Sequence, residues 1–321
     1  MNKKLQFFKK SSKINSKKII KIFWMLYAGF FLLLVLLFFF ISRGWLGFMP
    51  SFEELENPRT NLATEVYSED GELLGKYYIE NRSNCDYSEL SPMLLEALLA
   101  TEDIRFYKHS GVDIRALLRV TSGLLTFQKK GGGSTISQQL AKNLFPRDPN
   151  AGIVKLVITK LKEWVVAARL ERSYSKNEIL AMYFNTVDFG SNSLGIKSAA
   201  ATYFNKRPLD LSVEESAMLV GMLKAPTRFN PRRNPENAIQ RRNTVLKQME
   251  KYDYLTHTAF DSIKEIPIDI SQFSAQSHVS GKATYFREYL RLFLNDWCKK
   301  NPKEDGTYYD IYKDGLKIYT T

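Results

Sequence analysis

Cysteine and histidine are scarce in this chain, and the usual metal-binding patterns are missing. Among 321 residues there are two cysteines, Cys85 and Cys298, and three histidines, His109, His257 and His278. Two cysteines so far apart form neither a disulfide framework nor a metal cluster, and no HExxH or CxxC motif occurs. We therefore expect no zinc site built by the protein, and the pairing of the two cysteines is left open.

Acidic residues are absent from the first 21 positions, which hold eight of the 46 basic residues of the chain. The formal charge of +12 is therefore concentrated in this tail, because the other 300 residues carry 38 basic and 34 acidic side chains. A basic tail on a nearly balanced body is not the pattern of a nucleic-acid-binding protein, so nucleic acid is not an expected partner.

Charge is missing altogether between Ile22 and Ile41. About 20 apolar residues, at a rise of about 1.5 Å each, match the thickness of a bilayer core. A cleavable signal peptide has a shorter apolar run and a small-residue cleavage site, whereas this run is bulky and precedes Arg43. We predict a cytoplasmic basic tail at 1–21 and a transmembrane helix at 22–42, with everything after it outside the cytoplasm. The alternative is a buried core helix.

After a stalk at 43–60, the pattern predicts a short hairpin and then mostly helices. Two strand-like stretches flank Asp70-Gly71, a dipeptide typical of a tight hairpin turn. Residues 251–321 have weaker periodicity and end in a strand-like stretch at 315–321. The predicted helices, placed from capping residues and apolar spacing, cover 92–103, 114–125, 135–144, 153–172, 176–185, 194–204, 212–223 and 236–250.

Two adjacent carboxylates, Glu102 and Asp103, stand at the end of the first predicted helix, shortly before Phe106 and His109. Acidic residues are disfavoured at a helix C-terminus by the helix dipole. We interpret the placement as serving a cleft, where a carboxylate can act as a general base. The alternative is a solvated helix end that His109 caps.

Three glycines at 131–133 precede a predicted helix with several polar residues. On a helix that starts at Ser134, the side chains of Thr135, Gln139 and Lys142 would share one face. A hydroxyl, an amide and an ammonium group near a helix N-terminus suit an anionic ligand such as a pyrophosphate. The alternative is an ordinary amphipathic helix after a flexible loop.

Two further patterns have weaker chemical meaning. Lys160 and Glu163 are neighbours on a helix, and one interpretation of the two is an ordinary surface ion pair. Residues 173–176 match the Ser-x-x-Lys pattern of penicillin-binding serine enzymes. Because no Lys-Thr-Gly occurs in the sequence, we interpret this match as chance.

Together these segments resemble the glycosyltransferase domain of class A penicillin-binding proteins and monofunctional transglycosylases. The resemblance covers roughly 65–250 and closes with a block at 241–246. It departs from the family pattern at Thr159, where arginine is usual, and at Phe184, where leucine is common. The four main blocks are Glu102-Asp103-x-x-Phe106-x-x-His109-x-Gly111, then Gly132-Gly-Ser-Thr-Ile-Ser-Gln-Gln139 with Lys142-Asn143, then Lys160-x-x-Glu163, and Lys176-x-Glu178-Ile179-Leu180-x-x-Tyr183-Phe184-Asn185.

The resemblance implies a mainly α, lysozyme-like bilobal domain at 61–250 with a small β-hairpin, preceded by one transmembrane helix. A smaller, mobile, apolar lobe around 112–133 would lie against the bilayer. Residues 251–321 resemble a linker and the first strand of a transpeptidase domain whose signatures are missing. We therefore expect a fragment or truncated form of a bifunctional enzyme that neither cross-links peptides nor binds penicillin covalently.

The same resemblance implies a peptidoglycan glycosyltransferase that polymerises lipid II into β-1,4-linked glycan strands at the bacterial cytoplasmic membrane. Glu102 would be the general base for the acceptor 4-hydroxyl, the donor carbon would invert, and undecaprenyl pyrophosphate would leave. Glu163 would be the second catalytic carboxylate. Substrate binding would fall to Asp103, Phe106, His109, Ser134, Thr135, Gln138, Gln139, Lys142, Asn143 and Lys160.

No cofactor is required by this interpretation, although a divalent ion, Mg or Mn, could assist at the pyrophosphate. The expected partners are lipid II, the growing glycan strand, the bilayer, and cell-wall elongation or division proteins. Two other classes stay open. A lytic glycoside hydrolase also uses carboxylates, but it would not need the polar face of Thr135, Gln139 and Lys142. In an inactive, membrane-anchored wall scaffold, neither Glu102 nor Glu163 would be needed.

Overall fold

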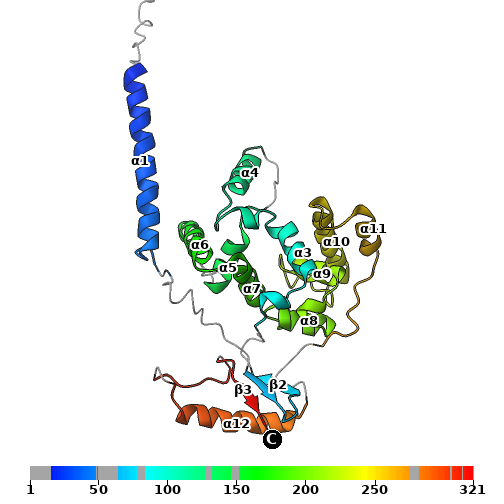
Figure 1. The fold of residues 1–321 in the computed structure, drawn as a ribbon. Helices are drawn as coiled ribbons and strands as arrows, with labels where there is room; N and C mark the ends of the chain where they lie inside the picture. Colours follow the sequence, from blue (N-terminus) through cyan, green and yellow to red (C-terminus); the bar gives the residue numbers. More distant parts are fainter. Residues whose placement is uncertain are drawn as a thin grey trace, which may run out of the picture.

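The computed structural model describes residues 16–47, 49, 64–77, 84–126, 132–145, 152–274, 282–303, 306–312 and 314–320. Most of the predicted basic tail and of the stalk, and the first of the three glycines at 131–133, lie outside these residues. The described part is mainly helical with one small sheet, which confirms the predicted fold class (Figure 1).

Helix α1 (Ser16–Ser42) confirms the predicted apolar helix, and its stretch from Lys17 is long and apolar enough to cross a membrane. It extends away from the rest of the protein and touches α6 (Ile153–Ser173) at its C-terminal end (Figure 1). There Arg169 of α6 donates a hydrogen bond of 2.8 Å to the carbonyl of Ser42, and the neighbouring Ile41 is fully buried.

Most of the other helices form one body around a single hydrophobic core (Figure 1). Where a helix was predicted, its observed ends agree within two residues. The helices of this body, besides α6, are α3 (Pro92–Glu102), α4 (Ile114–Leu125), α5 (Ile136–Leu144), α7 (Lys176–Thr186), α8 (Ile196–Phe204), α9 (Val213–Met222), α10 (Pro235–Lys251) and α11 (His257–Lys264), with short 3-10 turns η1 (Tyr87–Glu89), η2 (Phe106–Lys108) and η3 (Pro208–Asp210).

Capping boxes fix the starts of α7 and α9. The hydroxyls of Ser175 and Ser212 accept hydrogen bonds from the backbone N–H groups of Glu178 and Glu215, whose carboxylates bond back to the serine N–H groups. Helix α9 is buried along 216–222 and packs against α3 and α10. The core around α9 therefore holds the end of α3, where the two adjacent carboxylates lie.

A smaller unit lies below the helical body in Figure 1 and joins residues from two distant parts of the chain. Strands β1 (Thr64–Tyr67) and β2 (Leu73–Tyr77) form the predicted antiparallel hairpin, which turns at Gly71 with φ +80°. Strand β3 (Lys317–Tyr319) pairs with the other edge of β1 in parallel, so the sheet order is β2-β1-β3.

Helix α12 (Thr284–Lys300) packs on this sheet and closes a second hydrophobic cluster with Val66, Tyr77 and Ile311. The predicted domain limits at 61–250 and 251–321 therefore differ from the observed packing. The hairpin packs with residues from the C-terminal part, and the helical body continues through α11, whose Phe260 and Ile263 pack on the main core.

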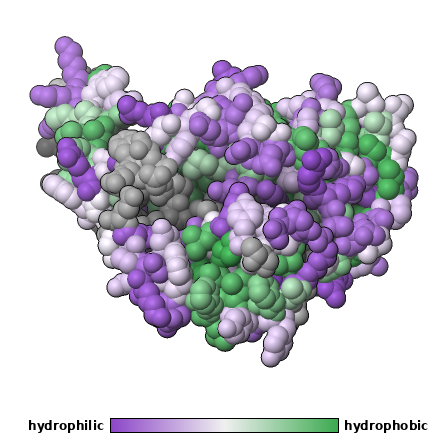
Figure 2. Space-filling model, turned by 60° about the horizontal axis from the view of Figure 1, so that its bottom comes forward, coloured by the Kyte–Doolittle hydropathy of each residue, from purple (hydrophilic) through white to green (hydrophobic). Residues whose placement is uncertain are grey.

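Helix α12 was not predicted because it is apolar on two sides, which hides the helical period. One side is buried against the sheet, while Tyr285, Tyr289 and Phe293 are exposed on the other. Figure 2 brings the lower part of the molecule forward and shows an apolar area on the surface of that part. Cys85 lies in the main core and Cys298 in the small unit, and both are free.

Candidate active site

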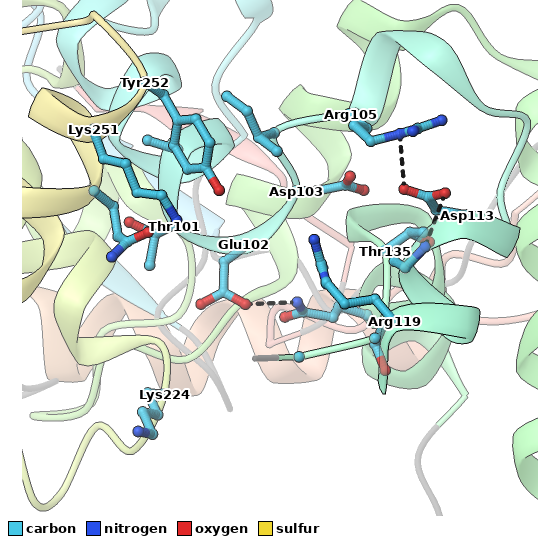
Figure 3. Close-up of a pocket in the computed structure, with 18 of the residues that line it drawn as sticks. Thr101, Glu102, Asp103, Arg105, Asp113, Arg119, Thr135, Lys224, Lys251 and Tyr252 are labelled. Carbon is cyan, nitrogen blue, oxygen red and sulfur yellow. Dashed lines mark hydrogen bonds and ion pairs between the residues drawn. The ribbon is translucent and has the colours of Figure 1, made fainter. Parts of the chain in front are cut away.

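A cavity of about 730 Å³ opens beside the C-terminal end of α3 (Figure 3). Its walls come from α3, α4, the start of α5, the residues after α9, and α10. The charged residues that line it within the described chain are three acids and five bases: Glu102, Asp103, Asp113, Arg105, Arg119, Lys224, Arg241 and Lys251.

Glu102, the last residue of α3, projects into this cavity (Figure 3). The side-chain amide of Gln139 donates a hydrogen bond of 2.9 Å to its Oε2 atom. The oxygen of the same amide accepts a hydrogen bond of 3.1 Å from the hydroxyl of Tyr183 on α7. The carboxylate is therefore oriented by a neutral donor and not by an ion pair.

Asp103 follows Glu102 but is buried, with 6% of its side chain exposed. Its Oδ2 atom lies 3.0 Å from His109 Nε2 and accepts a hydrogen bond of 3.1 Å from the N–H of Ile136, the first residue of α5. An acid at the C-terminus of one helix is thus placed at the N-terminus of another, where the dipole favours it. Asp103 ties α3 to α5, while Glu102 faces the open space.

Thr135 is the N-cap of α5, so the predicted helix start at Ser134 is wrong. Its hydroxyl accepts a hydrogen bond from the N–H of Gln138 and donates one of 2.6 Å to the carbonyl of Gly111. The predicted shared face of Thr135, Gln139 and Lys142 therefore forms only in part, because Lys142 is not among the described residues of the cavity. Ser134, Thr135 and Gln139 line the cavity, whereas Lys142 is exposed and, like Asn143, is not among the described lining residues.

Three predicted substrate-binding residues are buried instead of lining the cavity in the described structure. Phe106 is fully buried, Gln138 is 1% exposed, and the side chain of His109 is 4% exposed. Lys176 lies 4.2 Å from the centre of the Phe106 ring and donates a hydrogen bond of 2.7 Å to the carbonyl of His109. These residues pack against the core side of the loop after α3 and stabilise it.

The Lys176 of the Ser-x-x-Lys match is also paired with Glu171 at 2.6 Å, and Ser175 caps α7. The lysine of the match therefore has structural contacts, and Ser173, the serine of the match, is the last residue of α6.

Lys160 and Glu163 of α6 form more than a surface pair. The ammonium group of Lys160 lies 2.9 Å from Glu163 Oε2 and donates a hydrogen bond of 2.9 Å to the hydroxyl of Ser134, which lines the cavity. Only 5% of the Glu163 side chain is exposed. The second predicted carboxylate therefore lies behind the cavity wall and reaches it through Lys160 and Ser134. Thr159, which stands where arginine is usual, bonds to a carbonyl of its own helix.

Four basic residues of the cavity were not predicted from the sequence: Arg119, Lys224, Arg241 and Lys251. Arg241 opens the last block of the resemblance, and burial lowers the pKa of its guanidinium, an effect that the nearby charge of Glu102 opposes. Lys224 follows shortly after the C-terminal end of α9. Arg119 and Lys251 carry no local signal, and only the packing of α4 and α10 around one cavity brings them together.

Comparison with known proteins identifies the family of the chain. Residues 70–250, more than half of the chain, match the family model described as Transglycosylase. The chain belongs to the transglycosylase family. The matched stretch contains both carboxylates and every block of the resemblance, and it begins within the hairpin.

Two curated relatives of this transglycosylase are named penicillin-binding protein 1A, and one solved structure of a protein with the same name is also similar to it. The protein of Escherichia coli (strain K12) is 33% identical over 274 residues, which are 85% of this chain and 30% of the relative. The protein of Pseudomonas aeruginosa is 32% identical over 313 residues, 95% of this chain and 35% of the relative. A crystal structure of the Haemophilus influenzae protein covers 81% of this chain and 26% of its own, at 22% identity and a TM-score of 0.42. The chain thus spans about a third of the length of these curated relatives.

Proposed function

We propose that this transglycosylase polymerises lipid II into β-1,4-linked glycan strands, with inversion and release of undecaprenyl pyrophosphate. The observation that carries the proposal is a single carboxylate, Glu102, held by a neutral amide in a cavity whose walls carry five basic residues. Of the other two lining acids, Asp103 is paired with His109 and Asp113 with Arg105.

In the proposed reaction Glu102 takes the proton of the acceptor 4-hydroxyl. The oxygen forms a bond to the anomeric carbon of the donor, and the bond from that carbon to the lipid pyrophosphate breaks on the opposite face. The leaving group gains negative charge, so it needs cations and hydrogen-bond donors more than a strong acid. Arg119, Lys224, Arg241 and Lys251 supply such charges from two walls of the cavity.

Glu163 has a supporting part in this proposal. Its ion pair holds Lys160 on Ser134, so that a hydroxyl on the cavity wall is backed by an ammonium group. This arrangement strengthens the hydroxyl as a donor to a phosphate or sugar oxygen.

A resident metal ion does not fit the residues of the cavity. Among the described residues, no three carboxylate, histidine or cysteine side chains gather as metal ligands. Two lining acids are already paired with His109 and Arg105. A magnesium or manganese ion would therefore arrive bound to the substrate pyrophosphate.

We further propose that α1 spans the bacterial cytoplasmic membrane with the N-terminus in the cytoplasm, and that the first turns of α4 and α6 touch the bilayer. Ile114 and Leu118 of α4 are 69% and 65% exposed, and Ile153 and Val154 of α6 are 81% and 74% exposed. Helix α4 lies on the side of the body toward which α1 extends (Figure 1). Such a placement would bring the cavity to a substrate that is confined to the membrane, and it leaves room for wall-synthesis partners on the other side.

The proposal is tested by polymerisation of purified lipid II, with Glu102→Gln beside Glu96→Gln. Both glutamates belong to α3, but Glu96 is not among the described residues of the cavity. We expect a ladder of glycan products from the wild type and from Glu96→Gln, and a loss of at least about 100-fold in Glu102→Gln. Full activity of Glu102→Gln would overturn the proposal. Shortening of added glycan strands would indicate a lytic hydrolase, and a wild type without either activity would indicate a scaffold.

A further inference from the structure

Tyr183 is a buried residue that the proposed mechanism does not use. Its side chain comes from α7, is 1% exposed, and lies in the main core. Its hydroxyl nevertheless reaches the side-chain oxygen of Gln139, whose amide nitrogen bonds to Glu102. A buried hydroxyl is thus two hydrogen bonds away from the proposed base.

We propose that Tyr183 is a positioning residue for the base: its hydroxyl fixes the Gln139 amide in the orientation that donates a hydrogen bond to Glu102. The inference rests on the proposed function, because it takes Glu102 as the group that accepts the proton. It assigns to α7 a part in catalysis that needs no contact with the substrate.

The side-chain amide of Gln139 has two chemically different ends. A glutamine side chain has an acceptor oxygen on one side and a donor NH2 group on the other, and a tyrosine hydroxyl has one hydrogen to donate. With the Tyr183 hydrogen on the Gln139 oxygen, only the NH2 group is left to face Glu102. The flipped amide would place its oxygen against the carboxylate, with no hydrogen between the two acceptors.

Tyr183 keeps its proton under all conditions in which the enzyme would act. Burial raises the pKa of its hydroxyl well above the usual value of 10, and the negative charge of Glu102 adds to this effect. A neutral, buried hydroxyl is therefore a constant donor, unlike a histidine or lysine in the same place.

This orientation matters for a base in two ways. An N–H group that donates to a carboxylate favours its ionised form, which is the form that can accept a proton. The bond also engages Oε2 of Glu102, and no hydrogen bond to Oε1 is seen among the described residues. Oε1 is thus left to receive the proton of the acceptor sugar.

Other charged groups face Glu102 from three sides: Arg119 on α4, Lys224 after α9, and Arg241 and Lys251 on α10. Lysine and arginine side chains normally titrate above about pH 10. Asp103, the adjacent acid, points instead to His109 and the start of α5. The acidic limb of the pH profile is therefore the measurement that tests whether the hydrogen bond from Gln139 acts on Glu102.

The test compares Tyr183→Phe with Tyr203→Phe in full-length protein, by the pH dependence of kcat on lipid II. Tyr203 is also fully buried, and its hydroxyl donates a hydrogen bond of 3.0 Å to the carbonyl of Phe189, so it controls for the loss of a buried hydroxyl. For Tyr183→Phe we expect the acidic limb of the profile to move up by about one pH unit, with KM changed less than about twofold. Tyr203→Phe should keep the wild-type profile.

Gln139→Met is the second variant, because it removes the amide and leaves Tyr183 in place. The same upward shift in Gln139→Met, with no additional shift in the double variant, would show that the two residues act as one unit. An unchanged profile in either single variant, or an equal shift in Tyr203→Phe, would overturn the positioning role. Activity of Glu102→Gln would instead refute the proposed function, so the two failures are distinguishable.

Discussion

Glu102 and Asp103 are adjacent in the sequence, but their carboxylates have different surroundings and different partners. Glu102 ends α3 and faces the cavity, while Asp103 turns inward to the first N–H of α5. The pairing of Asp103 with His109 closes the loop between the two helices. The local sequence pointed to both acids, but it could not divide their roles, because α5 begins 33 residues later.

The basic residues of the cavity lead to a prediction at the residue scale. Lys224 is exposed on the cavity wall, so Lys224→Gln removes a charge without disturbing the core. We expect KM for lipid II to rise about fivefold at low salt, with the effect shrinking as salt is added, because an exposed charge contributes about 1 kcal/mol and is screened. Lys206→Gln, which breaks an exposed ion pair with Glu215, is the control. A fivefold rise in both variants would show that the effect is not local.

Gly111 leads to a second prediction, on stability. It has φ +87°, and a Cβ atom there would lie 2.8 Å from the backbone of Ala167 in α6. Its carbonyl also accepts the bonds of Thr135 and Gln138. We expect Gly111→Ala to lower the free energy of unfolding by about 2–4 kcal/mol, because it combines backbone strain with a clash.

Urea unfolding of Gly111→Ala beside Gly132→Ala measures this cost. Gly132 has open space around its Cβ position, so its variant should stay within about 1 kcal/mol of the wild type. Equal midpoints for the two variants would contradict the reason given for Gly111.

At the scale of elements, the sequence predicts best those helices that have a cap and one apolar face. Ser175 and Ser212 begin α7 and α9 at the predicted positions. The helix at α12 was missed because it is apolar on two sides, and the predicted start of α5 was wrong because Thr135 caps the helix from outside. The basic walls of the cavity were missed because they depend on packing between distant helices.

The contact between α1 and α6 leads to a prediction about how much the hydrogen bond of Arg169 stabilises their packing. Arg169 donates to the last carbonyl of α1, and burial lowers the pKa of its guanidinium. We expect Arg169→Gln to lower the free energy of unfolding of the chain in detergent by about 1–2 kcal/mol, because a charged hydrogen-bond donor is lost. The change is measured by thermal unfolding. In a chain without residues 1–42, Arg169→Gln should have a much smaller effect. An equal loss in both backgrounds would show that Arg169 acts within the body only.

At the scale of the whole molecule, each unit contains one cysteine, and this allows each to be followed separately. Cys85 is 1% exposed in the helical body and Cys298 is 5% exposed in the small unit. Burial raises the pKa of the Cys85 thiol from 9.0 to about 12, and it also raises that of Cys298. Since the thiolate is the reactive form, neither should be alkylated in the folded protein near pH 8.

Pulsed alkylation along a urea titration should therefore report the unfolding of each unit. We expect Cys298 to react at lower urea than Cys85, because the small unit has a much smaller core. The same midpoint for both thiols would show one cooperative unit.

The raised pKa of Cys85 also makes the stability of the helical body depend on pH. The contribution of the neutral Cys85 thiol to the free energy of unfolding is complete below about pH 9, and it is lost as the pH rises toward 12.

The parallel pairing of β1 with β3 delays completion of the sheet during synthesis of the chain. Glu65 lies opposite Lys317, so the sheet waits for residues made about 250 positions later. At about 5–20 residues per second, β1 and β2 would exist for roughly 13–50 s before their third strand is synthesised. During that interval one edge of β1 is open, and an open edge can pair with a strand of another chain. The order of synthesis thus leaves this small sheet incomplete until after the helical body has been made, and exposes its open edge to wrong pairing during that interval.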